Sequence, residues 1–231
     1  FTSRLGMDGT QNFTYGLDGT WRAFKDDYID VKIAQTRNDE DANKLSIHNT
    51  FALAQWQRRK EIGLGYLLKY YYSGEQFNPT MGYLQQNQMD FINAKVQYGF
   101  LAPKQSSWFQ LVPSIEHKRY TRLTDNALES AMTTGTIALS SKKQLLLSLA
   151  VTYDQEGVKN KYFISSKEGV YVDAGKYNFW YGTVNIQTPK ANAAYFESVL
   201  KYGEFYDGTQ MSVSFSKFST FCHLPIQLCS I

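Results

Sequence analysis

Alternation of apolar and polar residues with a period of two is the feature that most limits how this chain can fold. Leu147, Leu149 and Val151, for example, alternate with Ser148 and Thr152. Successive side chains of a β-strand point to opposite faces of a sheet, so the pattern predicts strands with one apolar and one polar face. Eleven segments show it and are predicted as strands: 12–24, 28–37, 45–57, 61–73, 88–101, 107–121, 128–139, 143–155, 176–187, 192–203 and 209–218.

The lengths of the strands and of their links narrow the fold class. Most of the predicted strands exceed the ~5–6 residues common in soluble sheets and reach the ~9–11 residues that a tilted strand needs to cross a bilayer. Short links, such as 25–27 and 58–60, alternate with longer ones, such as 37–44 and 156–175. Outer-membrane barrels alternate tight turns and long loops in this way. The sequence therefore predicts an all-β fold, a partial antiparallel up-and-down transmembrane β-barrel.

Two aromatic belts are also expected, because tryptophan and tyrosine gather at both membrane interfaces. Trp21, Trp56 and Trp108 each lie within a few residues of a short link. Four tyrosines lie towards the longer links: Tyr70, Tyr72, Tyr120 and Tyr153. A general preference of aromatic residues for strands is the alternative explanation.

Composition excludes several classes of protein. The 231 residues carry a net charge of +3 with scattered basic residues, so no nucleic-acid partner is expected. No segment approaches the ~20 apolar residues of a membrane helix, and residues 1–10 lack the apolar core of a signal peptide. Cys222 and Cys229 lack zinc-ligand spacing, so neither metal nor cofactor is predicted.

The ends of the chain suggest a piece of a longer protein. Bacterial outer-membrane barrels usually have an even number of strands, whereas eleven are predicted here. We therefore expect residues 1–218 to form a barrel segment, and residues 219–231 to be an atypical tail that is truncated or frame-shifted.

Charged residues fall on the predicted polar face of the strands and would line a lumen. Mixed charges in such a place usually form cross-strand ion pairs that fix the register, and selectivity filters are the rarer case. The candidates are Asp18, Arg22, Asp30, Lys32, Lys69, Lys95, Glu116, Lys118 and Asp154.

Four segments resemble, in order, motifs of a β-barrel family from Bacteroidota. That family is an uncharacterised domain usually found C-terminal to a family-9-like carbohydrate-binding module. "YGLDGTWR" at 15–22 resembles a family strand, and "FNPTMGYL" at 77–84 its FNP-x-x-G-aromatic signature. "YFISSKEGVYVDAGKYNFW" at 162–180 and "GEFYDGTQMSVSF" at 203–215 are similar to two later motifs. The resemblance runs over most of residues 6–218 and implies an outer-membrane protein linked to carbohydrate.

The FNP segment interrupts the strand pattern and is the candidate binding or structural loop. Proline fixes its own φ and restricts the residue before it, and glycine permits a positive φ where a loop doubles back. We expect a structural loop folded inwards, with direct ligand contact as the alternative. Gln85 and Gln86 stand where family members often have arginine, which argues against an anionic ligand. The loop candidates are Phe77, Asn78, Pro79, Gly82 and Tyr83.

Catalytic signatures are weak. Ser114 lies three positions from His117, on the opposite face of the same strand, and no nucleophile elbow or phosphate loop is present. We expect a non-catalytic outer-membrane segment, in contact with lipid, that anchors or forms a pore for a carbohydrate-handling surface protein. The alternatives are a saccharide or nutrient channel, a carbohydrate-active hydrolase, and a soluble β-sandwich binding domain.

Overall fold

Within the residues that it describes, the computed structural model is all-β apart from a short 3-10 helix. It describes residues 2–5, 11–38, 46–79, 88–165, 167, 169–190, 192, 194–219 and 222–227. The strands are β1 (Thr2–Leu5), β2 (Gln11–Phe24), β3 (Asp27–Asn38), β4 (Thr50–Arg58), β5 (Gly63–Ser73), β6 (Met89–Leu101), β7 (Trp108–Arg122), β8 (Leu128–Ser141), β9 (Leu146–Val158), β10 (Tyr162–Ser165), β11 (Val170–Val172), β12 (Gly175–Gln187), β13 (Ala194–Phe205), β14 (Gly208–Ser219) and β15 (Cys222–Gln227).

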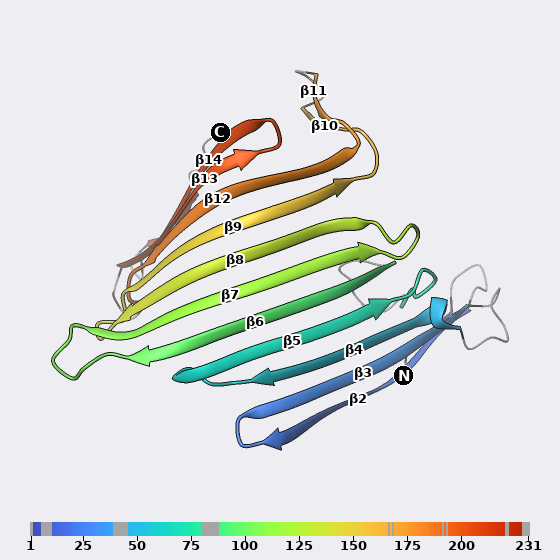
Figure 1. Ribbon diagram of the computed structural model, residues 1–231, viewed down its shortest axis with the longest axis horizontal. Helices are drawn as coiled ribbons and strands as arrows, with labels where there is room; N and C mark the ends of the chain where they lie inside the picture. The colour runs from blue at the N-terminus through green and yellow to red at the C-terminus, as the bar shows by residue number, and fades with distance from the viewer. Residues whose placement is uncertain are drawn as a thin grey trace. The chain divides into compact units, whose positions relative to one another are not determined.

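Neighbouring strands follow one another in chain order (Figure 1). The order runs from β1 to β9 and continues from β12 to β15, while β10 and β11 form a separate two-stranded sheet. The chain divides into two compact units. Unit 1 comprises Phe1–Arg59, Tyr66–Ala94 and Lys118–Ala131, and unit 2 comprises Lys60–Gly65, Lys95–His117 and Met132–Ile231.

Each of the eleven predicted strands has a counterpart, so the antiparallel up-and-down arrangement is confirmed. The largest error in a boundary is at the start of β4, which was expected at residue 45 and begins at Thr50. A 3-10 helix, Ile47–Asn49, precedes it. The Ser46 side chain accepts a hydrogen bond from the backbone N–H of His48 at 3.2 Å and caps this helix, which keeps the segment out of the strand.

The alternation within 176–187 suggests a change of phase near Gly182, as a β-bulge would produce, but this prediction is wrong. β12 pairs with β9 without interruption from Gly175 to Gln187, so β12 has no bulge against β9. The pattern misleads because Phe179 and Tyr181 lie on the polar face, alternating with Trp180 and Gly182 on the other face. Register shifts occur elsewhere, between β2 and β3 near the end of β2, between β14 and β15, and within the β10–β11 hairpin.

Three short elements were not expected. The long link 156–175 contains the β10–β11 hairpin. Part of the tail at 219–231 forms β15, which pairs with β14 through Lys217 and Ile226. β1 pairs with the first four residues of β2. Runs of three to six residues are too short for periodicity to distinguish a strand from an irregular link.

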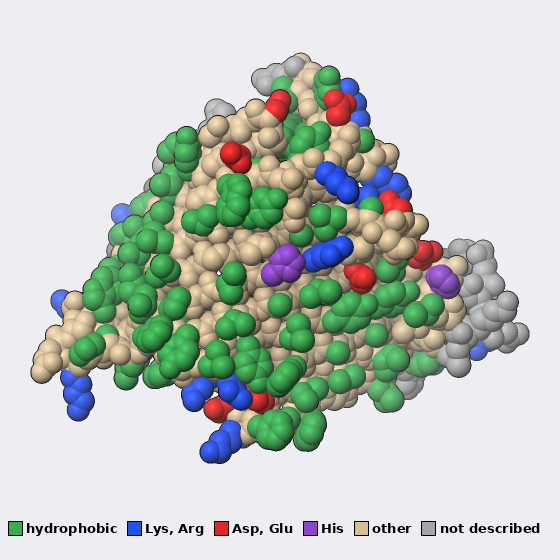
Figure 2. Space-filling model, viewed as in Figure 1, with side chains coloured by type: hydrophobic (Ala, Val, Ile, Leu, Met, Phe, Trp, Pro, Cys, Tyr) green, Lys and Arg blue, Asp and Glu red, His purple; other side chains and the backbone are tan. Residues whose placement is uncertain are grey.

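In both units one face of the sheet is apolar and exposed. The register places Leu17, Ile33 and Ala52 on one face of unit 1, and Leu200 opposite Val213 on one face of unit 2. Figure 2 shows hydrophobic side chains spread over much of the visible surface, among a smaller number of charged ones. Exposed residues of this face include Leu17, Val31, Ile33, Trp56, Leu68, Val96, Phe100, Ile115, Leu149, Val151, Trp180, Leu200 and Val213.

Gly99 illustrates how a turn packs against the polar face within unit 2. A Cβ atom there would lie 1.9 Å from the carbonyl oxygen of Glu61, a backbone atom that cannot move alone. We expect Gly99→Ala to destabilise the protein by about 1–3 kcal/mol through overpacking. Gly135→Ala is the matched control, because a Cβ there meets nothing within 4 Å. Equal midpoints for the two variants in denaturant titrations would contradict this arrangement.

Candidate functional site

The candidate loop begins directly after β5 and is tied by backbone hydrogen bonds to β4 and to the 3-10 helix that precedes it, both in unit 1. The N–H of Gly74 donates to the carbonyl of Thr50 at 2.9 Å, and the N–H of Gln76 donates to the carbonyl of His48 at 2.8 Å. A Cβ at position 74 would lie 2.2 Å from the His48 carbonyl, so only glycine fits there. These contacts hold the start of the loop close to the sheet.

The Asn78 end of the loop is held by side chains on the polar face of β2 and β3. The N–H of Asn78 donates to the Thr36 hydroxyl at 3.2 Å, and the Asn12 amide donates to the Asn78 carbonyl at 3.1 Å. Asn12 and Thr36 are both buried. Residues 74–79 therefore fold over the polar face, as expected for a structural loop. Gly82 and Tyr83 lie outside the described residues.

Phe77 anchors the loop in a run of aromatic rings on the same face. It is 4% exposed and stacks on Phe51 with ring centroids 5.7 Å apart. Phe51 in turn contacts Tyr71, which contacts Phe91 at 4.9 Å. Phe91 lies 4.4 Å from Tyr120. We call these five rings the aromatic row.

The aromatic row tests the expected positions of two residues, Tyr120 and Lys69. Tyr120 was expected in an interfacial belt, but it lies on the polar face with Phe91, so that placement is wrong. The reason is its phase in β7, where it shares a face with Lys118 and not with Ile115. Lys69 is on the polar face as predicted, and its amine lies 5.9 Å from the Tyr71 ring centre and 6.0 Å from that of Phe91.

Asp30 is the centre of a cross-strand network on the polar face of unit 1. Its carboxylate accepts hydrogen bonds from Thr20 at 2.7 Å, Gln55 at 3.0 Å and Gln57 at 3.2 Å. The Arg59 guanidinium is 3.8 Å away. Because β2, β3 and β4 all contribute, Asp30 fixes the register of three strands, which is the structural role expected for such residues.

Alternation places the other predicted charges on the polar face of their own strands. Asp18 in β2 lies directly opposite Lys32 in β3. Arg22 donates to the carbonyl of Lys25 and stacks 5.8 Å from the Tyr28 ring, which makes it part of the turn. The remaining four are Lys95 on β6, Glu116 and Lys118 on β7, and Asp154 on β9. Because Asp18 and Glu116 belong to different units, the paired carboxylates that a hydrolase needs are not assembled from them within either unit.

One charged cluster was missed because it lies on the apolar face. Asp27, 2% exposed, receives hydrogen bonds from the Arg58 guanidinium at 2.6 and 2.9 Å. The Tyr66 hydroxyl donates to the same carboxylate at 2.9 Å. The Trp56 ring meets the Tyr66 ring edge-on at 5.2 Å. A carboxylate at the first residue of a strand looks like part of a turn, so only the register shows that its neighbours are Arg58 and Tyr66.

A second cluster that the sequence does not predict lies in unit 2, beside the β13–β14 turn. The Tyr206 hydroxyl donates to the Glu156 carboxylate and lies 2.5 Å from the Tyr162 hydroxyl. Burial and the hydrogen bond to Glu156 raise the pKa of Tyr206 above its ordinary range. The Tyr206 ring also contacts Phe179, which is almost fully buried. This cluster ties the β10 hairpin to β9 and the β13–β14 turn.

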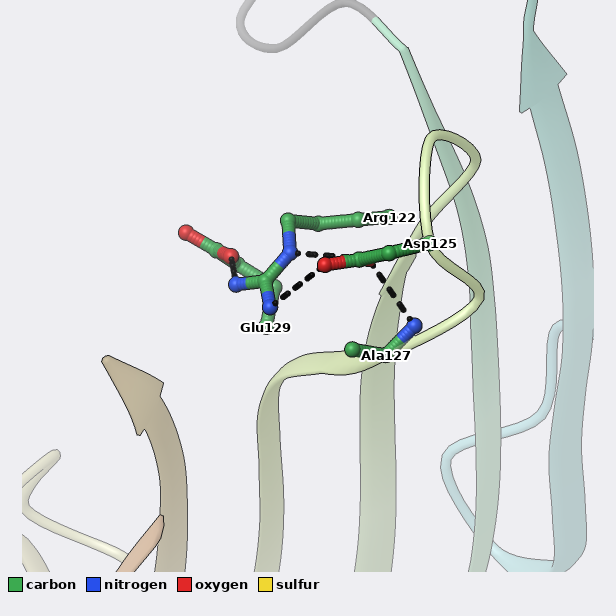
Figure 3. A network of polar contacts seen from close by, with 4 residues as sticks. All are labelled: Arg122, Asp125, Ala127 and Glu129. Atoms are coloured by element: carbon green, nitrogen blue, oxygen red, sulfur yellow. Dashed lines mark hydrogen bonds and ion pairs between the residues drawn. The ribbon is translucent and has the colours of Figure 1, made fainter. Parts of the chain in front are cut away.

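The β7–β8 turn is closed by a clamp on Arg122 (Figure 3). Its guanidinium contacts both carboxylate oxygens of Asp125 at 3.2 Å and the Glu129 carboxylate. Asp125 also accepts from the N–H of Ala127 at 3.1 Å. The donors and acceptors satisfy one another within the turn, so a structural role accounts for the cluster.

Catalytic and metal chemistry find little support in the described residues. His117 contacts the Thr133 hydroxyl at 2.9 Å, and alternation along β7 places Ser114 on the other face. No group of three or more potential metal ligands occurs within the described ranges. Among those residues there is also no helix long and apolar enough to cross a membrane.

Comparisons with family models, curated proteins and solved structures found no match to this chain.

Proposed function

We propose that this chain forms membrane-spanning strands of a Gram-negative outer-membrane β-barrel and serves as an anchor. The observation that carries the proposal is the exposure of the apolar face along strands of 9–15 residues in both units. Among the described residues only five hydrophobic side chains are buried: Phe77, Phe91, Ala131, Val172 and Phe179. A soluble domain would instead bury its apolar side chains between two layers.

The number of large hydrophobic side chains exposed on the apolar face supports the same conclusion. Contiguous apolar patches above a few hundred Å² require cover. Strands of this length match the thickness of a bilayer, so lipid is the cover that we propose.

Loop 74–79 and the aromatic row favour an anchor over an open channel. In a barrel the polar face of the strands faces the lumen. Phe77 and Phe91 are buried there, and the loop is fixed by Asn12 and Thr36. Side chains and a loop would therefore fill this part of the lumen. The resemblance of the FNP segment to a Bacteroidota family supports an outer-membrane location and a carbohydrate-handling parent protein.

Fractionation and conductance together test the proposal. We expect the chain to remain in the membrane pellet after an alkaline carbonate wash, and to need detergent to stay monodisperse, because its apolar face is exposed. In planar bilayers we expect no steady conductance. Monodisperse protein in plain buffer would overturn the membrane assignment, and stable single-channel currents would replace the anchor by the channel alternative.

A further inference from the structure

The short turns of unit 2 carry a row of exposed lysines. Four turns link β4 to β5, β6 to β7, β8 to β9 and β12 to β13. Their residues 60–62, 102–107, 142–145 and 188–193 hold five lysines and a single acidic residue, Glu61, so the formal charge is five positive minus one negative, or +4. The lysines are Lys60, Lys104, Lys142, Lys143 and Lys190.

Backbone contacts bring three of these turns together along one edge of the unit. The N–H of Lys142 donates to the carbonyl of Ser107 at 3.1 Å, and its amine donates to the carbonyl of Lys104. The pairing of Leu146 with Gln187 places the β8–β9 turn beside the β12–β13 turn. The turns that hold Lys104, Lys142, Lys143 and Lys190 are therefore neighbours in space.

None of the five lysines has an acidic partner within ion-pair distance among the described residues. The far end of the strands in unit 2 differs, because Lys161 lies 3.6 Å from Asp173 there. The sequence at that end holds five acidic residues and four lysines, so it is close to neutral, whereas the short turns carry +4. These nine residues are Glu156, Glu168, Asp173, Glu204, Asp207, Lys159, Lys161, Lys167 and Lys176. Positive charge is therefore concentrated at the end of unit 2 that holds the short turns.

Exposed apolar side chains border the lysine row. Phe100, Leu101, Trp108 and Phe109 stand at the ends of β6 and β7, next to the turn that holds Lys104. Phe100 has the phase of Val96 and Phe109 has the phase of Ile115, so both lie on the apolar face. Aromatic side chains at the end of an apolar face, with lysines just beyond them, are the arrangement found where a barrel crosses from hydrocarbon to headgroups.

We propose that this lysine row binds the phosphate groups of anionic phospholipids. The inference rests on the proposed membrane function and adds to it the leaflet contacted by the short turns, which in outer-membrane barrels is the periplasmic one. Each lysine near a negatively charged leaflet strengthens binding about fivefold, so three lysines together contribute on the order of a hundredfold.

Folding into lipid vesicles tests the inference. The folding equilibrium constant is measured by urea titration in phosphatidylcholine vesicles and in vesicles that also contain phosphatidylglycerol. The variant K104Q/K142Q/K143Q removes three charges from the row. The control K159Q/K167Q/K176Q removes three exposed lysines at the other end of the strands in unit 2. We expect phosphatidylglycerol to favour folding of the wild type and the control about a hundredfold more than folding of the first variant.

The outcomes separate this inference from the proposed function. A wild type that inserts into neither kind of vesicle would overturn the membrane assignment itself. Insertion with no effect of phosphatidylglycerol, or equal losses in both triple variants, would overturn the headgroup inference alone. The effect of phosphatidylglycerol on folding is also measured in sodium phosphate and in sodium chloride at matched ionic strength. If phosphate reduces this effect more than chloride does, the lysines form a site for free phosphate, and the headgroup inference is overturned.

Discussion

Replacing Leu200 by arginine will destabilise the protein in lipid vesicles by about 2–4 kcal/mol, the range for a charge placed at the bilayer midplane on the lipid side of a barrel. Leu200 lies near the middle of β13, is 36% exposed, and pairs with Val184 and Val213 on the apolar face. The measurement is a urea titration of folding in vesicles, with tryptophan fluorescence as the signal.

The neighbouring residue supplies the control. Val199 is also apolar, but it lies on the other face, opposite Asn185 and Ser214. Val199→Arg puts the same charge at the same depth into the polar interior, where we expect a smaller loss. If Leu200→Arg were the milder of the two, or changed stability by less than about 0.5 kcal/mol as at an ordinary wet surface, lipid would not cover this face.

Replacing Phe77 by alanine will cost about 3–5 kcal/mol, the usual range for emptying a buried phenylalanine site. Its ring is the contact that joins the loop to the aromatic row through Phe51. Phe163→Ala is the comparison, because Phe163 is 57% exposed on the β10 strand and should be nearly neutral. Both variants are titrated in the same vesicles.

Similar urea midpoints for the two phenylalanine variants would mean that the Phe77 ring does not hold the loop. Loss of protection of the Asn78 amide against hydrogen exchange in Phe77→Ala, with β2 and β3 still protected, would show separately that the loop has detached. That second readout distinguishes release of the loop from general unfolding.

The strands could be predicted from sequence because one face of each is exposed and apolar, which leaves an unbroken period of two. In β9, Leu149 and Val151 alternate with Ala150 and Thr152 over a length that only a strand explains. Periodicity fails where both faces carry aromatic residues. Phe179 and Tyr181 on the polar face of β12 imitate a change of phase that the register does not contain.

The sequence could predict on which face the residues of the candidate site lie, but not which side chains they contact. Asp30 and Lys69 lie on the polar face, as alternation requires. Their partners depend on which residues of neighbouring strands fall opposite, and turn lengths set this. The contact of Phe77 with Phe51 joins residues 26 positions apart, so no local pattern could reveal it. Asp27 and Arg58 became neighbours in the same way.

The chain-order arrangement of the strands also bears on how the protein assembles. When each strand pairs with the next, almost every native pairing closes a short segment, so contact order is low and hairpins can add one after another. The two longest enclosed segments are residues 74–88 between β5 and β6 and residues 159–174 between β9 and β12. The small β10–β11 hairpin lies inside the second segment and draws its ends together, which reduces the entropy lost when β9 pairs with β12.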